Sequence, residues 1–221
     1  TRGDPGHSLD TIRFTKESLV ASAICGFARL LTGARAVWKG CAPAAVQRIY
    51  YGNHTSHGDF VLIYASLPAD LRVHTRPVAG ADYWNATRLK RWIANDVLRA
   101  VMVERQKREG GPNPVEQMVD ALDHGDSLIL FPEGTRNTTD LPLLPFKSGI
   151  FRAVEARPEV ECVPVWIENL NRVMPKGQVL PIPLLCTLTF GTPLKVAPGE
   201  DKDAFLDRLR DGLVTLSPPP G

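Results

Sequence analysis

The feature that most constrains the fold of this chain is the alternation of short apolar runs with longer segments of helical periodicity. Apolar runs predict buried strands at 48–53, 71–80, 100–104, 127–131, 161–167 and 184–194. Apolar residues at helical spacing predict helices at 18–34, 59–67, 82–98, 113–125, 148–158 and 201–216. This alternation indicates an α/β domain with a partly parallel sheet, because parallel strands need long, usually helical, crossovers.

The length of the chain and the absence of an internal repeat or linker favour a single domain. The chain has 221 residues, enough for one sizeable core and short for two. We expect an N-terminal helical segment at 1–40, the main domain at 41–217 and a tail at 218–221. The predicted fold class is therefore α/β: a single domain with a mixed, partly parallel sheet flanked by helices and an N-terminal amphipathic helix.

The N-terminal segment leaves two roles open. Its apolar residues recur at helical spacing and define one face; they are Leu19, Ala23, Phe27, Leu30 and Leu31. Such a helix can lie in a membrane interface, or it can cover the domain's own core. No stretch of the chain reaches the roughly 20 apolar residues that a transmembrane helix needs.

Charge and cysteine content exclude some classes of protein. The net charge of +2 excludes a strongly basic nucleic-acid binder. Two basic clusters, at 88–99 and 105–108, can face anionic headgroups or phosphorylated substrates, or can be solvated helix faces. The four cysteines lack the spacing of a zinc site or a disulfide framework, so a reducing compartment fits best.

The stretch "YGNHTSHGDF" at 51–60 supports three interpretations. His54, His57 and Asp59 are metal-ligand types, although an H-x-H-x-D-H alignment leaves two ligand positions unfilled. Ser56 and Asp59 form a capping-box pattern before an apolar helix, in which Ser56 accepts from the amide of residue 59 and Asp59 reaches back. The third interpretation has Asp59 accepting from one nitrogen of His54, so that the other acts as a general base towards a hydroxyl.

A second stretch, "LILFPEGTRN" at 128–137, ends a predicted strand in a glycine and an arginine. Gly134 lets backbone amides approach a ligand, and Arg136 offers a bidentate fork for a phosphate. Taken alone, the stretch is more typical of a strand-to-turn junction with a surface arginine.

Together the two stretches resemble the glycerolipid acyltransferases typified by 1-acylglycerol-3-phosphate acyltransferase. The pattern N-H-x-S-x-x-D covers 53–59, and F-P-E-G-T-R covers 131–136. A short strand ending in Arg105 resembles the second block of the family, and V-P-V at 163–165 the fourth. Three positions depart from the usual pattern: Gly58, Arg99 and Asn137.

The resemblance implies a mechanism and a set of partners. His54, held by Asp59, would deprotonate the hydroxyl of a lysophosphatidic-acid-like acceptor, which attacks an acyl thioester. The acceptor would be held by substrate-binding residues, namely Arg105, Glu133, Gly134, Thr135, Arg136 and Lys147. Acyl-CoA or acyl carrier protein would supply the acyl group, with no cofactor and no metal.

The resemblance also implies where such a protein acts. Because the acceptor is a lipid, we expect peripheral contact with an anionic membrane surface, at the inner, cytoplasmic face. Two other functions stay open at this point: a metal-dependent hydrolase using His54, His57 and Asp59, and a catalytically silent lipid-binding relative.

Overall fold

The computed structural model of the chain describes residues 6–56, 58–104, 113–168 and 186–218. The strands of this part of the chain are β1 (Arg35–Trp38), β2 (Arg48–Gly52), β3 (Thr75–Gly80), β4 (Val101–Val103), β5 (Ser127–Leu130), β6 (Glu161–Glu168) and β7 (Thr187–Phe190). They form one sheet in the order β1-β7-β6-β2-β5-β3-β4. Strands β6 and β7 are antiparallel, and the other neighbouring pairs are parallel.

The helical elements alternate with these strands along the chain. They are α1 (Gly6–Thr32), α2 (Asp59–Ser66), α3 (Ala69–Arg72), α4 (Ala81–Trp84), α5 (Arg88–Trp92), the π-helix η1 (Ile93–Val97), α6 (Pro114–Asp123), α7 (Gly149–Ala156) and α9 (Lys202–Val214). The predicted class, a single α/β domain with a mixed and mostly parallel sheet flanked by helices, is confirmed.

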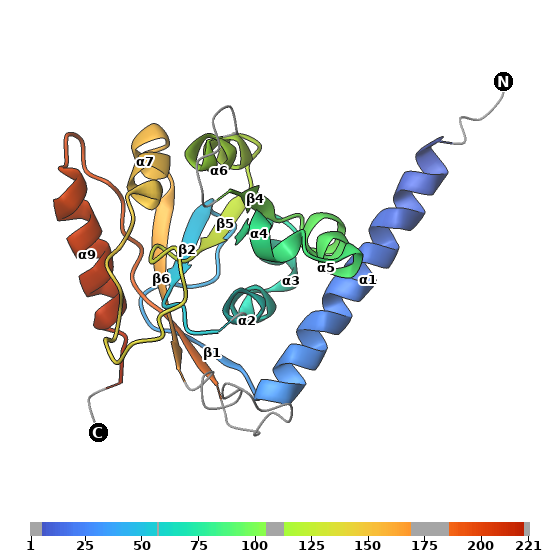
Figure 1. The fold of residues 1–221 in the computed structure, drawn as a ribbon, viewed down its shortest axis with the longest axis horizontal. Helices are drawn as coiled ribbons and strands as arrows, with labels where there is room; N and C mark the ends of the chain where they lie inside the picture. The colour runs from blue at the N-terminus through green and yellow to red at the C-terminus, as the bar shows by residue number, and fades with distance from the viewer. Residues whose placement is uncertain (1–5, 57, 105–112, 169–185, 219–221) are drawn as a thin grey trace.

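The sheet is buried on both faces, which explains its nearly continuous apolar strands. Side chains alternate along β2: Tyr50 belongs to the core under α2, whereas Ile49 and Tyr51 belong to the core under α6, α7 and α9. Figure 1 shows this arrangement, with α7 and α9 on one side of the sheet and α2 on the other. A one-residue register slip of β2 would exchange these two faces.

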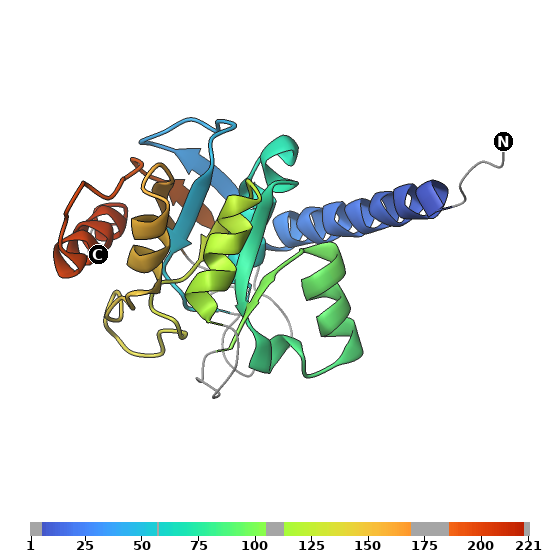
Figure 2. The ribbon, with the colours of Figure 1, turned by 90° about the horizontal axis from the view of Figure 1, so that it is seen from above.

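Helix α1 packs on the domain with one face and exposes another. Cys25 is buried, and Val20 and Ile24 pack against the core beside α2. Leu19, Phe27 and Leu30 lie on the outer face with exposed fractions of 69%, 66% and 84%, respectively. The N-terminal part of α1 extends beyond the body of the domain (Figures 1 and 2). Among the described helices, none has the length and hydropathy needed to cross a bilayer.

The structure corrects several predicted elements. The helix predicted at 82–98 is divided into α4, α5 and η1, because Thr87 is extended and caps α5 by accepting from the amide of Lys90. The strand predicted at 71–80 begins only at Thr75, after the short helix α3. Strand β1 was not predicted; it is a four-residue edge strand whose Trp38 stacks on Phe190.

The parallel strands β2, β5 and β3 end at the same edge of the sheet, and this edge carries the predicted site. The loop that follows β2 holds His54, and the loop that follows β5 holds the 131–136 stretch. Ligands of open α/β sheets bind outside the carboxyl ends of the strands. The topology therefore brings together two motifs that are almost eighty positions apart in the sequence.

Candidate active site

The first loop is fixed to the sheet by Asn53, at the end of β2. Asn53 is buried, its side-chain oxygen accepts from the amide of Ile167 at 2.8 Å, and its amide nitrogen donates to the carbonyl of Ile167 at 3.0 Å. This side chain continues the pairing of β2 with β6 by one further residue. These two hydrogen bonds therefore fix the position of the backbone just before His54.

His54 and Asp59 are in direct contact. Nδ1 of His54 lies 2.8 Å from Oδ2 of Asp59, and the two side chains are 11% and 0% exposed. The same Asp59 oxygen accepts from the amides of Thr55 at 2.7 Å and Ser56 at 2.9 Å. Because three donors converge on one oxygen, the carboxylate is held in place independently of the imidazole.

The capping interpretation and the base interpretation both describe this loop. Asp59 reaches back to the amide of Ser56, as a capping box requires. The reciprocal contact is different from the expectation, because Oγ of Ser56 accepts from the amide of Gly58 rather than from residue 59. Gly58 occupies the N-cap position of α2 without a side-chain cap bond. The carboxylate of Asp59 therefore stabilises the start of α2 and also orients His54.

The other oxygen of Asp59 is buried and has no hydrogen-bond partner among the described residues. The carboxylate of Asp59 interacts electrostatically with the buried thiol of Cys186. Burial, with the charge of Asp59 adding to it, raises the pKa of Cys186 to about 11. Ionisation of the Cys186 thiol is therefore disfavoured.

The second loop holds His54 from the other side. The ring of Phe131 stacks on the imidazole, with ring centroids 4.3 Å apart and planes inclined by 14°. The amide of Asn137 donates to the carbonyl of His54 at 2.6 Å. The carboxylate of Glu133 accepts from the amide of His54 at 2.8 Å and from the amide of Leu144 at 2.8 Å. Burial raises the pKa of the Glu133 carboxyl, against the opposite effect of the two amides.

A cavity of about 540 Å³ opens beside His54, a size typical of small-molecule sites. Four of the predicted substrate-binding residues line it together with His54; they are Gly134, Thr135, Arg136 and Lys147. Its apolar wall comes from strand ends and helices, namely Val78, Val103, Met118, Leu130 and Ile150. The cavity is also lined by the acidic residues Asp82 and Glu104, so it places cations, carboxylates and an apolar surface beside the His54–Asp59 pair.

Gly134 and Lys147 are packed against one another at this cavity. Gly134 has φ = 67°, in the left-handed region. A Cβ built on it would lie 2.7 Å from Cδ and 2.9 Å from Nζ of Lys147. The amide of Lys147 also donates to the carbonyl of Pro132 at 2.8 Å. The glycine therefore leaves room for the lysine side chain to lie across the loop.

Two predicted residues lie outside the described part of the chain: Arg105, expected to contact the acceptor phosphate, and His57, a ligand in the metal interpretation. Within the described ranges, no three His, Cys, Asp or Glu side chains form a group that could hold a metal ion. Nδ1 of His54 is engaged by Asp59.

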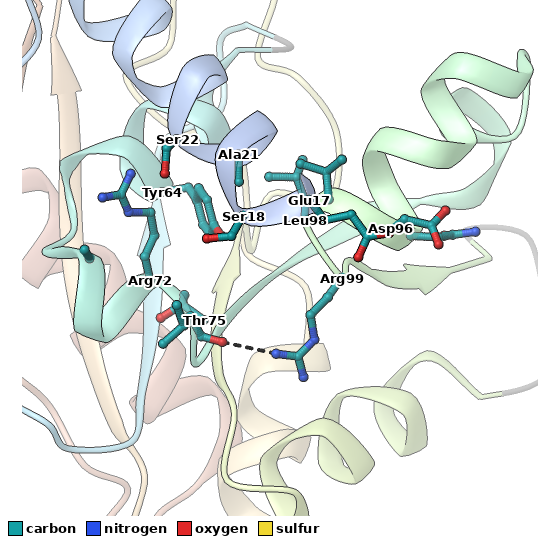
Figure 3. Close-up of a pocket in the computed structure, with 14 residues that line it drawn as sticks. Glu17, Ser18, Ala21, Ser22, Tyr64, Arg72, Thr75, Asp96, Leu98 and Arg99 are labelled. Carbon is teal, nitrogen blue, oxygen red and sulfur yellow. Dashed lines mark hydrogen bonds between the residues drawn. The ribbon is translucent and has the colours of Figure 1, made fainter. Parts of the chain in front are cut away.

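A second cavity, of about 320 Å³, lies at the other end of β3 under α1 (Figure 3). Thr75, at the start of β3, lines it, whereas Val78 and Gly80, at the end of that strand, line the cavity beside His54. Arg99 donates to the carbonyl of Val73 at 3.1 Å and lies 3.5 Å from Asp126. None of the described residues that line this cavity is a histidine, and Arg99 is engaged by the backbone and by Asp126, so the second cavity has no counterpart of the His54–Asp59 pair.

Three contacts of the site could not be read from the sequence. Asn53, Phe131 and Asn137 belong to the two motifs, but their partners are distant in sequence or depend on how the loops meet. The available signal was their position: Asn53 and Asn137 directly flank His54 and Arg136, and Phe131 lies two residues before Glu133.

Comparisons with known proteins agree with this geometry. A family model described as "Acyltransferase" matches residues 41–168. A 1-acyl-sn-glycerol-3-phosphate acyltransferase from Chlamydomonas reinhardtii is 31% identical over 120 residues, covering 54% of this chain and 35% of that protein. A protein of the same name from Haemophilus influenzae is 30% identical over 107 residues, covering 48% of this chain and 41% of that protein. The chain thus spans less than half the length of either relative.

A solved structure shares the fold. The crystal structure of the 1-acyl-sn-glycerophosphate (LPA) acyltransferase from Thermotoga maritima matches with a TM-score of 0.67, covering 90% of this chain and 79% of that one. The two sequences are 21% identical over this match. At this identity the likeness extends to the architecture of the sheet and its helices.

Proposed function

The chain belongs to the acyltransferase family, and we propose that it transfers a fatty acyl group from an acyl thioester to the free hydroxyl of lysophosphatidic acid or a similar lysophospholipid. The product with lysophosphatidic acid is phosphatidic acid. The names of the two curated relatives, both 1-acyl-sn-glycerol-3-phosphate acyltransferases, support this acceptor.

One observation carries the proposal: His54, held by the buried Asp59, lines a cavity that is also lined by cationic side chains. When Nδ1 donates its proton to Asp59, Nε2 of the neutral ring has a free lone pair. General-base catalysis by such a nitrogen contributes roughly 10²- to 10⁴-fold in rate. The stacked ring of Phe131 and the backbone contacts of residue 54 limit the orientations of the imidazole.

The reaction needs only the groups of the chain and its two substrates. Nε2 of His54 accepts the proton of the acceptor hydroxyl as the oxygen attacks the thioester carbon. Asp59 stabilises the imidazolium that forms. When the tetrahedral intermediate collapses, the carbon–sulfur bond breaks and the thiolate leaves with the proton from His54. We propose that these reaction steps involve no metal, no cofactor and no covalent acyl-enzyme.

The phosphate of the acceptor would lie beside Arg136 and Lys147. Both side chains line the cavity, and neither forms an ion pair with another described residue. Gly134 also lines the cavity, with its amide donating to the carbonyl of Phe131 at 2.9 Å, and Thr135 adds a hydroxyl. We keep Arg105 as a further phosphate contact on the basis of its position in the second family block.

The acyl chain would lie along the apolar wall formed by the ends of β3, β4 and β5 and by α6 and α7. Met118 of α6 and Ile150 of α7 form part of that wall. A coenzyme A donor and an acyl carrier protein donor present the same thioester, so the mechanism applies equally to both.

We further propose that the outer face of α1 contacts an anionic membrane, at its cytoplasmic face. Leu19, Phe27 and Leu30 are exposed there, and Arg29 lies exposed among them. Apolar side chains with neighbouring cations are typical of helices that lie in a membrane interface. The contact would bring the cavity close to its lipid acceptor.

Co-sedimentation with vesicles that contain anionic lipid tests this contact. Replacing Leu19, Phe27 and Leu30 together by serine should reduce binding strongly and leave the fold intact, because their side chains are exposed. Val46→Ser removes an exposed apolar residue elsewhere and serves as the control. Undiminished binding of the triple variant would contradict the proposed membrane contact.

The activity itself is tested by incubating the protein with acyl-CoA or acyl carrier protein and lysophosphatidic acid. We expect release of free thiol together with phosphatidic acid, identified by mass spectrometry. Thiol release without phosphatidic acid would indicate hydrolysis of the thioester. The proposal would be contradicted if neither donor gave a product, whether the acceptor was lysophosphatidic acid or glycerol 3-phosphate.

A further inference from the structure

The carboxylate of Glu133 is directed into the protein rather than into the cavity. The side chain is 2% exposed. Its neighbours along the loop line the cavity beside His54, but Glu133 does not; those neighbours are Phe131, Pro132, Gly134, Thr135 and Arg136. A contact between this carboxylate and an acceptor in the cavity would require the loop to rearrange.

Both oxygens of Glu133 are used by backbone amides. Oε1 accepts from the amide of His54 and Oε2 from the amide of Leu144, each at 2.8 Å. Hydrogen bonds to an ionised acceptor are shorter and about twice as strong as neutral ones. Since both oxygens already accept from backbone amides, neither is left to bind an acceptor in the cavity.

Through these two bonds one side chain joins three segments of the chain. The segments are the loop after β2 with His54, the loop after β5 with Glu133 itself, and the residues that lead to Lys147. The amide of Asn137 binds the carbonyl of the same His54. The peptide units on both sides of the imidazole are thereby tied to the second loop.

We propose that Glu133 is a positioning residue, which fixes the backbone of His54 and the segment carrying Lys147, and does not bind the acceptor. This inference rests on the proposed function and refines its site. A displacement of about 1 Å at a reacting group can cost on the order of a hundredfold in rate. The loss of Glu133 should therefore lower kcat, and the loss of an acceptor contact should raise KM.

Glu133→Gln is the most direct variant. Glutamine keeps the shape of the side chain, but both partners are amide donors and only its oxygen can accept. One of the two bonds must therefore be lost. We expect kcat to fall about tenfold or more, with KM for lysophosphatidic acid within about twofold of the wild-type value. Arg136→Gln, at a proposed phosphate contact, should show the opposite pattern.

Glu133→Asp keeps the charge but is one methylene shorter, so it can maintain the bond to one amide only. We expect its kcat to lie between those of the wild type and Glu133→Gln. Glu155→Gln, on the exposed side of α7, is the control for the substitution itself and should leave both constants unchanged. If Glu133→Gln fails to fold, the aspartate variant still tests the split between kcat and KM.

The backbone amide proton of His54 provides a readout that does not depend on activity. A carboxylate acceptor moves an amide proton downfield, so this resonance and that of Leu144 should move upfield in Glu133→Gln and stay in place in Arg136→Gln. An unchanged His54 amide in Glu133→Gln, or a raised KM with unchanged kcat, would overturn the positioning role. If the wild type is inert with every substrate, the proposed function fails, while the amide resonance still decides the role of Glu133.

Discussion

Among the residues that the structure describes, two histidine–aspartate pairs occur, and they differ in burial and in the contacts that hold them. His54 and Asp59 lie 2.8 Å apart at the end of β2, with side chains 11% and 0% exposed. His124 and Asp120 lie 3.7 Å apart at the end of α6, with side chains 70% and 73% exposed. The imidazole of His124 contacts the carbonyl of Asp120 at 2.7 Å. The same two residue types thus form a constrained pair in one place and a solvated pair in the other.

The difference lies mainly in the backbone around each pair. Asp59 is held by the amides of Thr55 and Ser56, and the backbone of His54 is held by Glu133 and Asn137. In the other pair the contacts all come from within one helix end. Exposed pairs of this kind contribute little free energy, because water screens them and their side chains stay mobile. Burial and long-range backbone contacts, rather than the pairing itself, make the first pair suitable for chemistry.

The largest difference between the pairs should appear when each aspartate is replaced by asparagine. Asp59→Asn keeps an oxygen that can accept, but it removes the charge that stabilises the imidazolium. We expect kcat to fall by about 10²-fold or more, measured as phosphatidic acid formed per minute. Asp120→Asn should leave kcat unchanged. Equal activities of the two variants would remove the distinction between the pairs.

A smaller effect is expected when a glycine near each pair is replaced by alanine. These glycines are Gly134, which lines the cavity beside His54, and Gly125, which follows His124. Gly134 and Gly125 both have positive φ, 67° and 83°, so alanine costs roughly 1–2 kcal/mol of stability at either position. A Cβ at Gly134 meets the Lys147 side chain, whereas a Cβ at Gly125 meets nothing within 4 Å.

Only Gly134→Ala should therefore raise KM for the acceptor, by displacing the Lys147 ammonium group. The two glycine variants would be compared by thermal unfolding and by steady-state kinetics. A raised KM in Gly125→Ala, or an unchanged one in Gly134→Ala, would show that the packing of Lys147 against the loop is not used in binding.

The smallest effect concerns the pH dependence of the exposed pair. The hydrogen bond to the carbonyl of Asp120, with the charge of its carboxylate, raises the pKa of His124 above 6.5. A histidine with a raised folded-state pKa stabilises the fold fully below its unfolded pKa and loses this contribution as the pH rises through the folded value.

The stability advantage of the wild type over His124→Ala should thus be largest below pH 6.5 and shrink towards pH 8, as followed by urea unfolding. The NMR titration of His124 in Asp120→Asn should retain part of the shift, because the backbone carbonyl remains. A stability difference that grows with pH would contradict the sign of this pKa shift.

Local sequence signals predicted much of the fold. Asn113, Pro114 and Gly125 marked both ends of α6, and the structure places Asn113 at its N-cap and Gly125 just after its end with positive φ. The division of the helix at 82–98 was also encoded locally, since Thr87 is a strong N-cap residue. Strand β1 was not predictable in this way, because its stability depends on pairing with β7, some 150 residues away.

The site shows the same limit. The five-residue spacing of His54 and Asp59 made their contact one of three interpretations, because a turn entering a helix can bring such positions together, and the second motif was needed to favour it. The partners of Glu133 were not predictable, since the carboxylate reaches an amide 79 positions away. The resemblance to a family suggested an acceptor contact for this residue, and its burial and hydrogen bonds favour a positioning role.

The central claim is that His54 acts as the general base, and the most direct measurement compares His54→Ala with His124→Ala. Both variants remove one imidazole, and His124 lies exposed at the end of α6. With acyl-CoA and lysophosphatidic acid, we expect His54→Ala to form phosphatidic acid at least about a hundred times more slowly than the wild type, and His124→Ala at the wild-type rate. Full activity of His54→Ala would contradict this assignment.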